Sequence, residues 1–348
     1  MTHHTIRLRD MAKALELSTS TISKALRDSY EISQETKSKV LAYAAEVGYH
    51  PNNIAKSLKE GRSRTIGVVI CSIDNNFVSQ ILNGIDRHCN SRGYNMIIMQ
   101  SKESNDQEKK CVELLYARGI DGLLISPAIE TDDVTHLIKL HQQGLPIVLF
   151  DRISDQLNVP KVTSDNEKGA FLATEHLLQN GYKKIAVLCS HSKLNINVER
   201  LAGYRQALKH HGIPFREELI KPCKLNCAAL LRESLLQAMQ ELMSANEIPD
   251  AILATSDQIS TQCLNIIHQL GYRIPQDIAL IGFTNAELAE ALNPSLSTIN
   301  QPADEMGELA AQKLLDLIEQ KDTASLPVTK LNTSLIIRNS SEAKMAKH

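Results

Sequence analysis

The chain has 348 residues, 43% of them hydrophobic and 22% charged, which excludes a wholly disordered protein and indicates two or three compact units. The net charge of −2 excludes a uniformly basic protein, yet residues 1–63 carry ten Lys or Arg against seven Asp or Glu, leaving +3 there and −5 elsewhere. No apolar run approaches the ~20 residues that span a bilayer, and Met1–His4 opens no secretory signal, so we expect a cytoplasmic protein without a membrane partner.

Residues 6–49 have the apolar spacing of short helices. Three stripes recur at helical intervals, namely Met11, Ala12 and Leu15, then Ile22, Ala25 and Leu26, then Val40, Leu41, Ala44 and Val47. Ser18 is a suitable N-cap for a helix that begins at Thr19, and Pro51 disfavours helical backbone at His50. Three short helices with a tight turn between the first two predict a helix-turn-helix head over residues 1–50.

Residues 51–63 separate this head from the rest of the chain. Asn52–Leu58 could form about two helical turns, and a helix that short is marginal alone in water. We therefore expect a hinge that is either a plain tether or a segment that folds only when bound.

From Thr65 onward, apolar strands alternate with amphipathic helices. The expected strands are Ile66–Cys71, Met96–Met99, Leu123–Ser126, Ile147–Phe150, Ile185–Cys189, Ala251–Ala254 and Ile278–Phe283. This alternation predicts an α/β body of doubly wound parallel sheets over residues 64–340, with a tail at 341–348. So many strands favour two lobes, one of about 64–163 and 292–325, the other of about 164–291 and 326–340.

The cysteines and the known catalytic motifs do not indicate an enzyme. The seven cysteines are scattered, and Cys71 and Cys189 fall in strands, where a buried reduced thiol is expected. Cys223 and Cys227 lack a histidine partner at zinc-finger spacing, so we expect no metal site. A phosphate-binding loop, a nucleophile elbow and a dinucleotide fingerprint are all missing from the sequence, so we expect no cofactor and no catalysis.

Polar residues that follow strands are the candidates for binding a ligand, because doubly wound sheets bind ligands at the carboxyl ends of their strands. They are Asp74, Asn75 and Asn76 after the first strand, Asp151 and Arg152 after the fourth, and Asp257 after Ala251–Ser256. Carboxylates and amides suit a hydroxyl-rich ligand such as a sugar or polyol, and Phe77 could supply an apolar face. Asp151 and Arg152 could instead simply pair with each other.

Residues 10–58 resemble the DNA-binding region of the lactose repressor/galactose repressor family. The resemblance rests on Asp10–Lys13, Leu17–Leu26, Ile32-Ser33 with Thr36, and Gly48–Asn52 with Ala55. It continues through the body at Thr65–Val69, Gly119–Gly122, Phe150–Arg152, Asp165-Asn166, Arg200–Tyr204 and Ile281–Phe283. The resemblance covers about residues 6–338, and its motifs occur in the same order along the chain as in the family, through head, hinge and body.

This resemblance implies a transcription repressor that binds double-stranded operator DNA as a homodimer. Base contacts would come from Thr19, Ser20 and Lys24, with Ser23 on the same helix, and phosphate contacts from Ser18, Ser33, Thr36 and Lys37. In the hinge, Asn52 belongs to the matching motif, and Ala55 and Leu58 would enter the minor groove. Without the resemblance, the same residues also fit a solvated helix face and a surface leucine on a linker.

The resemblance also implies a two-lobed, periplasmic-binding-protein-like body with a small effector between the lobes. It adds Arg200 and Asp165 to the effector candidates, although Asp165-Asn166 could instead cap a helix. A sugar-binding transport component would share this body, but it would need a signal peptide and no helical basic head.

The sequence departs from the family pattern at four places. Glu16 stands where the family usually has Gly, Arg7 stands where a Thr usually caps the first helix, and Lys24 replaces the commoner Arg. Phe283 is followed by Thr284-Asn285 where the family often has an acidic residue.

Overall fold

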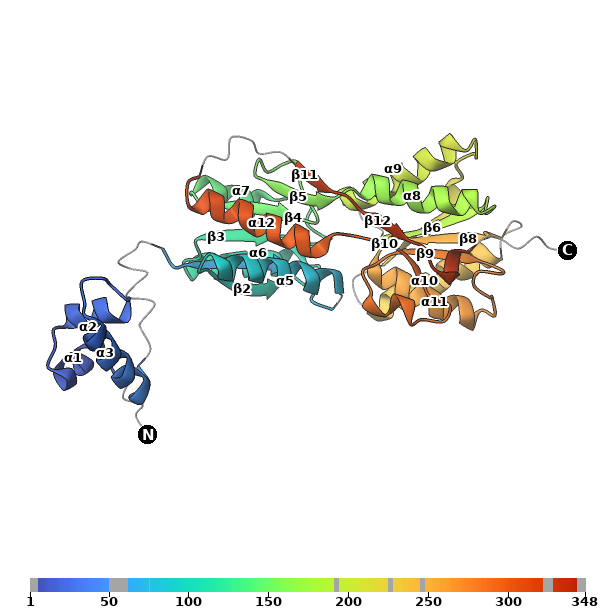
Figure 1. Cartoon of the computed structure of the whole chain (residues 1–348). Coiled ribbons are helices and arrows are strands. Elements are labelled where there is room, and N and C mark those ends of the chain that lie inside the picture. Colours follow the sequence, from blue (N-terminus) through green and yellow to red (C-terminus); the bar gives the residue numbers. More distant parts are fainter. Residues whose placement is uncertain are drawn as a thin grey trace. The chain divides into compact units, whose positions relative to one another are not determined.

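The computed structural model describes residues 6–49, 62–74, 76–190, 194–224, 228–244, 248–321 and 328–342. The chain separates into two compact units, a head of Met1–Ser63 and a body of Arg64–His348 (Figure 1). Among the described residues, none of the helices is both long and apolar enough to cross a membrane.

The described part of the head, residues 6–49, has three helices around a small apolar core. They are α1 (Leu8–Leu15), α2 (Thr19–Leu26) and α3 (Gln34–Glu46). One residue from each helix, Met11, Ile22 and Val40, is fully buried, as the apolar stripes predict. Leu41 is the exception: it is 52% exposed, so its place in the third stripe was wrong.

Two of the family departures have visible structural consequences in α1. Glu16 ends the helix in the left-handed region, with φ of 54°, which is the conformation that favours the glycine usual at this position. At the other end, the backbone N–H of Arg7 donates to Asp10 Oδ2 at 2.8 Å. Asp10 thus supplies a capping interaction at a helix start that has no Ser or Thr cap.

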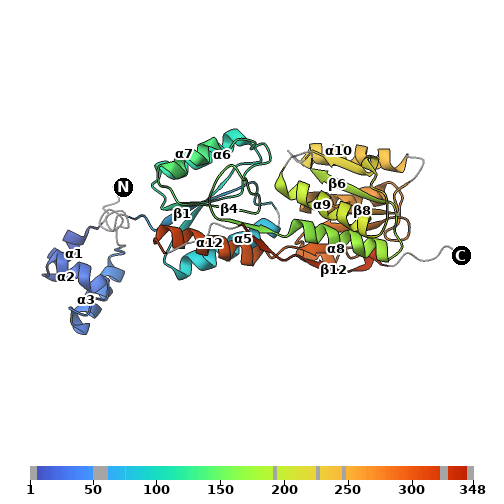
Figure 2. The same ribbon diagram turned by 90° about the horizontal axis from the view of Figure 1, so that it is seen from above.

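The first lobe of the body is a sheet covered by helices on both faces (Figures 1 and 2). Its six strands among the described residues run in the order β11-β5-β4-β3-β1-β2, all parallel. Helices α5 and α12 pack on one face, and α6 and α7 pack on the other. The strands are β1 (Thr65–Ile70), β2 (Asn95–Gln100), β3 (Gly122–Ile125), β4 (Ile147–Phe150), β5 (Lys161–Ser164) and β11 (Val328–Leu331); the helices are α5 (Asn76–Ser91), α6 (Asn105–Ala117), α7 (Thr135–Gln142) and α12 (Ala303–Ile318).

The second lobe repeats this plan. Its described strands run β12-β10-β9-β8-β6-β7, parallel except for β12 against β10. Helices α8 and α9 pack on one face, and α10 and α11 on the other. The strands are β6 (Ile185–Ser190), β7 (Ile220–Cys223), β8 (Ala251–Ala254), β9 (Ala279–Phe283), β10 (Ser297–Asn300) and β12 (Ser334–Ile336); the helices are α8 (Asn166–Gln179), α9 (Asn195–His210), α10 (Ala228–Met243) and α11 (Asp257–Gln269), with 3-10 turns at Glu217–Leu219, Glu287–Glu290 and Asn339–Ser341.

The lobe boundaries differ from those expected at residues 292 and 326. Strand β10 pairs with β9 and therefore belongs to the second lobe, whereas β11 pairs with β5 and belongs to the first. The chain thus crosses between lobes after Ser164, after Asn300 and after Leu331. Strands β5, β7, β10, β11 and β12 were not anticipated, because each is three or four residues long and most contain polar residues or a proline.

Candidate functional sites in the head and the body

Helix α2 exposes one polar face and buries the other. Ile22 and Ala25 lie in the core of the head, which turns Thr19, Ser20 and Lys24 toward solvent. Ser23 is half-buried beside them. A helix with short polar and basic groups along its exposed face can enter the major groove and reach base edges.

The ammonium group of Lys24 is already paired in the free head. It forms an ion pair with Glu31, which lies in the turn between α2 and α3. The side chains are 47% and 46% exposed, so water screens this pair and its net contribution is about 0–1 kcal/mol. Lys24 can therefore leave Glu31 for another partner at small cost.

Ser18 and Ser33 play the same structural part at the starts of α2 and α3. Each hydroxyl accepts a hydrogen bond from a backbone N–H three residues on, Thr21 at 3.0 Å and Thr36 at 3.3 Å. Ser33 Oγ also lies 2.9 Å from Thr36 Oγ1. Ser18 and Ser33 are exposed and Thr36 is half-buried. An anion such as a phosphate can therefore approach the N-terminal ends of α2 and α3 at these residues.

Lys37 lies in different surroundings from the other expected DNA contacts. Its side chain is only 11% exposed, and its Nζ lies 2.7 Å from Asp28 Oδ1 and 3.3 Å from the Asp28 carbonyl oxygen. The ammonium group therefore ties α3 to the turn after α2. Of the expected hinge contacts, Asn52, Ala55 and Leu58 lie outside the described residues.

The body contains a cleft lined by both lobes. It encloses about 860 Å³ of space not filled by protein atoms, including its open mouth. The carboxyl ends of β1, β3 and β4 reach it from the first lobe, and those of β8 and β9 reach it from the second, as expected for doubly wound sheets. A concave site between two lobes, with a few polar side chains beside apolar ones, is typical of small-molecule binding.

Of the nine candidates for the effector site, five line this cleft. They are Phe77, Asp151, Arg152, Arg200 and Asp257. Asp74, Asn76 and Asp165 do not line it, and Asn75 lies outside the described residues. Phe77 is 7% exposed and joins the apolar core beneath the cleft floor.

Arg200 is buried and holds together several parts of the body. Its Nε donates to Asn166 Oδ1 at 2.9 Å, its Nη1 donates to the carbonyl of Thr255, and its Nη2 donates to Gln301 Oε1 at 2.9 Å. The guanidinium lies 4.2 Å from the centre of the Phe283 ring. Burial lowers the pKa of Arg200 to about 10, which leaves the group charged at neutral pH.

Asp257 begins α11 and faces the cleft from the second lobe. Its Oδ1 accepts a hydrogen bond from the Thr284 hydroxyl. Burial raises the pKa of Asp257, although the Thr284 bond opposes this. Thr284 follows Phe283, where the family often has an acidic residue, and here its hydroxyl donates a hydrogen bond to the carboxylate of Asp257.

Arg152 pairs with Glu103, which the sequence analysis missed, and not with its neighbour Asp151. Two guanidinium nitrogens lie 2.6 and 2.9 Å from the Glu103 carboxylate oxygens, and Nη1 also lies 3.0 Å from Cys71 Sγ. Burial alone would raise the pKa of Glu103, but Arg152 holds it below its usual range. The position of Glu103 near a strand end was predictable, because it follows β2 as Asp151 follows β4, but its pairing with Arg152 was not.

Asp151 is left without Arg152 as a direct partner. It has φ of 59°, a left-handed conformation that is uncommon for residues other than glycine but more frequent for aspartate than for most. Burial raises the pKa of Asp151, while Arg152 and Arg200 oppose this rise. Asp165 has the structural role that the sequence left open: its Oδ1 accepts from Lys168 N at 3.0 Å and caps α8.

A polar helix-turn-helix head joined to a body with a small-molecule cleft defines a ligand-responsive DNA-binding regulator. Residues 7–52 match the bacterial regulatory proteins of the lacI family, and residues 174–341 match the periplasmic binding protein-like domain. The chain belongs to the lacI family.

Known proteins resemble this chain over almost its whole length. The ribose operon repressor of Haemophilus influenzae is 30% identical over 312 residues, which is 90% of this chain and 92% of that protein. The transcriptional repressor PurR of Vibrio vulnificus is 29% identical over 332 residues, covering 95% of this chain and 97% of the relative. The lac repressor dimer bound to operator and an anti-inducer is 26% identical, with a TM-score of 0.83 over 97% of this chain and 99% of that one.

These similarities establish the class of activity. The protein is a DNA-binding transcription regulator with a small-molecule effector. The alternative of a sugar-binding transport component finds no support, because the match includes the DNA-binding head.

Proposed function

We propose that this protein is a cytoplasmic, non-enzymatic repressor whose effector is a neutral, hydroxyl-rich molecule such as a sugar or polyol. The proposal rests on which charged groups of the cleft already have partners within the protein and which do not. The terminal nitrogens of Arg152 are engaged by Glu103, and the guanidinium of Arg200 is engaged by Asn166, Thr255 and Gln301. Asp151 and Asp257 line the same cleft, and among the described residues Asp257 uses only its Oδ1, in the bond to Thr284.

Acceptor carboxylates beside an apolar wall suit hydroxyl groups on a compact ring. Each carboxylate can accept hydrogen bonds from two hydroxyls, and Phe77 gives the ring an apolar surface. An anionic ligand would meet two carboxylates and two guanidinium groups that already have partners. The name of the ribose operon repressor among the relatives agrees with a carbohydrate.

For the head, we infer that Thr19, Ser20 and Lys24 read bases, with Ser23 beside them. Ser18, Ser33 and Thr36 would contact phosphates, and Lys37 would do so only by sharing its ammonium group with Asp28. Asn52, Ala55 and Leu58 complete the proposed contacts in the minor groove. Two copies of the head on a dimer favour a pseudo-palindromic operator.

A thermal-shift screen of the full-length protein tests the effector class. The panel contains neutral sugars, polyols, sugar acids and nucleobases. A ligand present at 100 times its dissociation constant should stabilise the protein by about 2.7 kcal/mol. We expect hits among neutral sugars or polyols, and these hits should also change affinity for an operator selected from random DNA. Hits confined to sugar acids or nucleobases would refute the proposed class, and a random pool that yields no palindrome would refute the DNA-binding mode.

A further inference from the structure

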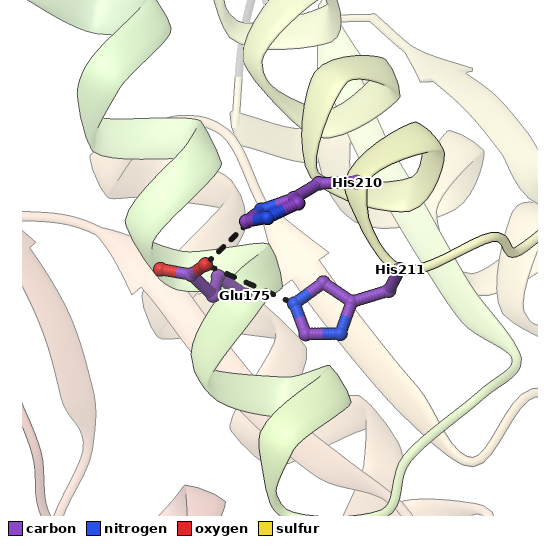
Figure 3. A group of neighbouring side chains, drawn as sticks. All are labelled: Glu175, His210 and His211. Atoms are coloured by element: carbon purple, nitrogen blue, oxygen red, sulfur yellow. Dashed lines mark ion pairs between the residues drawn. The ribbon is translucent and has the colours of Figure 1, made fainter.

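Three potential metal ligands converge on the outside of the second lobe, away from the effector cleft. Glu175 comes from α8, and His210 and His211 come from the end of α9 (Figure 3). His210 Nδ1 lies 3.5 Å and His211 Nε2 lies 3.8 Å from Glu175 Oε1. One ligand atom from each residue lies within 4.8 Å of the other two.

The packing of α8 against α9 places these side chains together. The helices run side by side in the same direction: Asn166 bonds to Arg200 near their starts, and the ring of Phe171 stacks on His210 at 6.0 Å further along. They pack closely because Gly203 lies against Glu167, where a Cβ would come within 2.0 Å of the Glu167 carbonyl oxygen. The close packing fixes the distance across which Glu175 meets the histidines.

The end of α9 explains why two consecutive histidines face the same carboxylate. Successive side chains in a helix point about 100° apart. His210 is the last residue of α9, His211 is its C-cap, and Gly212 then leaves the helix with φ of +67°. As Figure 3 shows, both rings lie beside Glu175 from this turn.

Two imidazoles and one carboxylate are the donors of many Zn²⁺ sites that keep a fourth position for water. Metal–ligand bonds of about 2.0–2.2 Å bring ligand atoms closer together than they lie here. The side chains of His210 and His211 are 66% and 29% exposed, so their rings are free to rotate toward Glu175 and close this difference. Among the described residues, Glu175 has no ion pair with Lys or Arg, so a metal would not have to displace one.

We propose that Glu175, His210 and His211 bind one divalent transition-metal ion, with Zn²⁺ as the probe. The ion joins the far ends of α8 and α9; the other ends of these helices carry Asn166 and Arg200, of which Arg200 lines the cleft. The alternative arrangement is a plain surface pairing of histidines with a carboxylate, which would have no preference for Zn²⁺. This site could not be predicted from the sequence, because 34 residues separate Glu175 from the first of the two histidines.

Isothermal titration of the chelator-treated full-length protein with Zn²⁺ tests the site. We compare the parent with Glu175→Gln, with a double variant His210→Asn plus His211→Asn, and with His268→Asn. His268 is an exposed histidine in the last turn of α11 in the same lobe and serves as the matched control. His3 and His4 are common to all four proteins, so any Zn²⁺ that they bind is the same in each. The six cysteines in the described part of the chain are all buried.

Loss of one ligand should weaken Zn²⁺ binding at this site at least about ten-fold, since even outer-shell partners of metal ligands contribute 10- to 100-fold. The melting temperature should rise with Zn²⁺ in the parent and in His268→Asn, and not in the other two variants. Melting curves without metal show whether each variant is folded. Equal Zn²⁺ affinity and stoichiometry in all four proteins, or no binding by the parent at about 100 µM Zn²⁺, would overturn the proposal.

Discussion

Replacing Asp257 by Asn should separate ligand binding from folding and from DNA binding. The change keeps the shape of the side chain and the possibility of a bond to Thr284, and removes one negative charge from the second lobe's wall of the cleft. A hydrogen bond to a charged group contributes about 1.5–3 kcal/mol. Because the amide oxygen still accepts hydrogen bonds, we expect the lower end of this range, about a ten-fold loss of effector affinity.

The pH dependence of stability follows from the raised pKa of Asp257. Because burial raises this pKa, the folded protein holds the proton to higher pH than the unfolded chain does, and ionisation above that range costs folding free energy. Asn avoids this cost. At pH 7 the variant should therefore melt at the same temperature as the parent or higher, and any gain should shrink as the pH falls toward about 4, the usual carboxyl range.

Effector titration, operator titration and thermal melting measure these three properties on the same protein. Asp106→Asn is the matched control, because Asp106 is an exposed aspartate in the first turn of α6 and does not line the cleft. Both variants should bind operator within a few-fold of the parent. If folded Asp257→Asn responds to the effector as the parent and the control do, the assignment of Asp257 to the effector site is wrong.

Four further substitutions test the other parts of the proposal. Lys24→Ala should cost about 1–3 kcal/mol of operator affinity and relax the preference at one base position per half-site; a uniform loss on all sequences would show that Lys24 touches phosphate only. Leu58→Ala should weaken operator binding more than binding to random DNA, since a wedge acts where the base step unstacks easily, and equal losses would make it a linker residue. Glu16→Gly should stabilise the head by about 1 kcal/mol because it relieves the left-handed backbone, measured as slower hydrogen exchange of α1 and α2 amides, and unchanged exchange would contradict this. Arg200→Ala should lower the free energy of unfolding by about 3 kcal/mol or more, since it leaves three acceptors without their donor, and a melting temperature equal to the parent's would contradict the bonding described.

The sequence predicted the helices of the head and the long buried strands well, because apolar spacing reports burial directly. It failed at β10 and β11, which are short and were not anticipated, so the residue ranges that contain them were placed in the wrong lobes. Their pairing depends on which sheet edge the chain reaches after crossing between lobes. Local spacing carries no information about that choice.

The sequence predicted several residues that line the cleft, but it did not predict which side chains they would bond to. The rule that ligands bind at the carboxyl ends of strands placed Asp151 and Asp257 correctly on the cleft. It could not reveal that Arg152 turns to Glu103, because this pair is 49 residues apart and forms only when two strand ends come together. Lys37 shows the same limit in the head, since its burial against Asp28 depends on how α3 packs.

Arg200 and Asp257 line the same cleft, but only Arg200 bonds to the crossing between the lobes, so we expect the two residues to affect the effector response differently. Gln301 lies in the crossing between β10 of the second lobe and α12 of the first, and Arg200 holds its side chain. Asn285 holds the backbone of the same crossing and also donates to Gln80 Oε1 of α5 at 2.7 Å. A rearrangement of the lobes must change these bonds.

An effector shifts the equilibrium between lobe arrangements only if it binds one of them better. A ligand beside Arg200 touches a group whose bonding depends on the crossing at Gln301, so that ligand can distinguish the arrangements. Among the described residues, the Asp257 carboxylate bonds to Thr284 of its own lobe and makes no direct bond to the crossing at Gln301. Loss of the Asp257 charge should therefore be overcome by more effector, which restores the full response. Loss of Arg200 should leave a reduced response even at saturating effector, because the contact that distinguishes the two arrangements is gone.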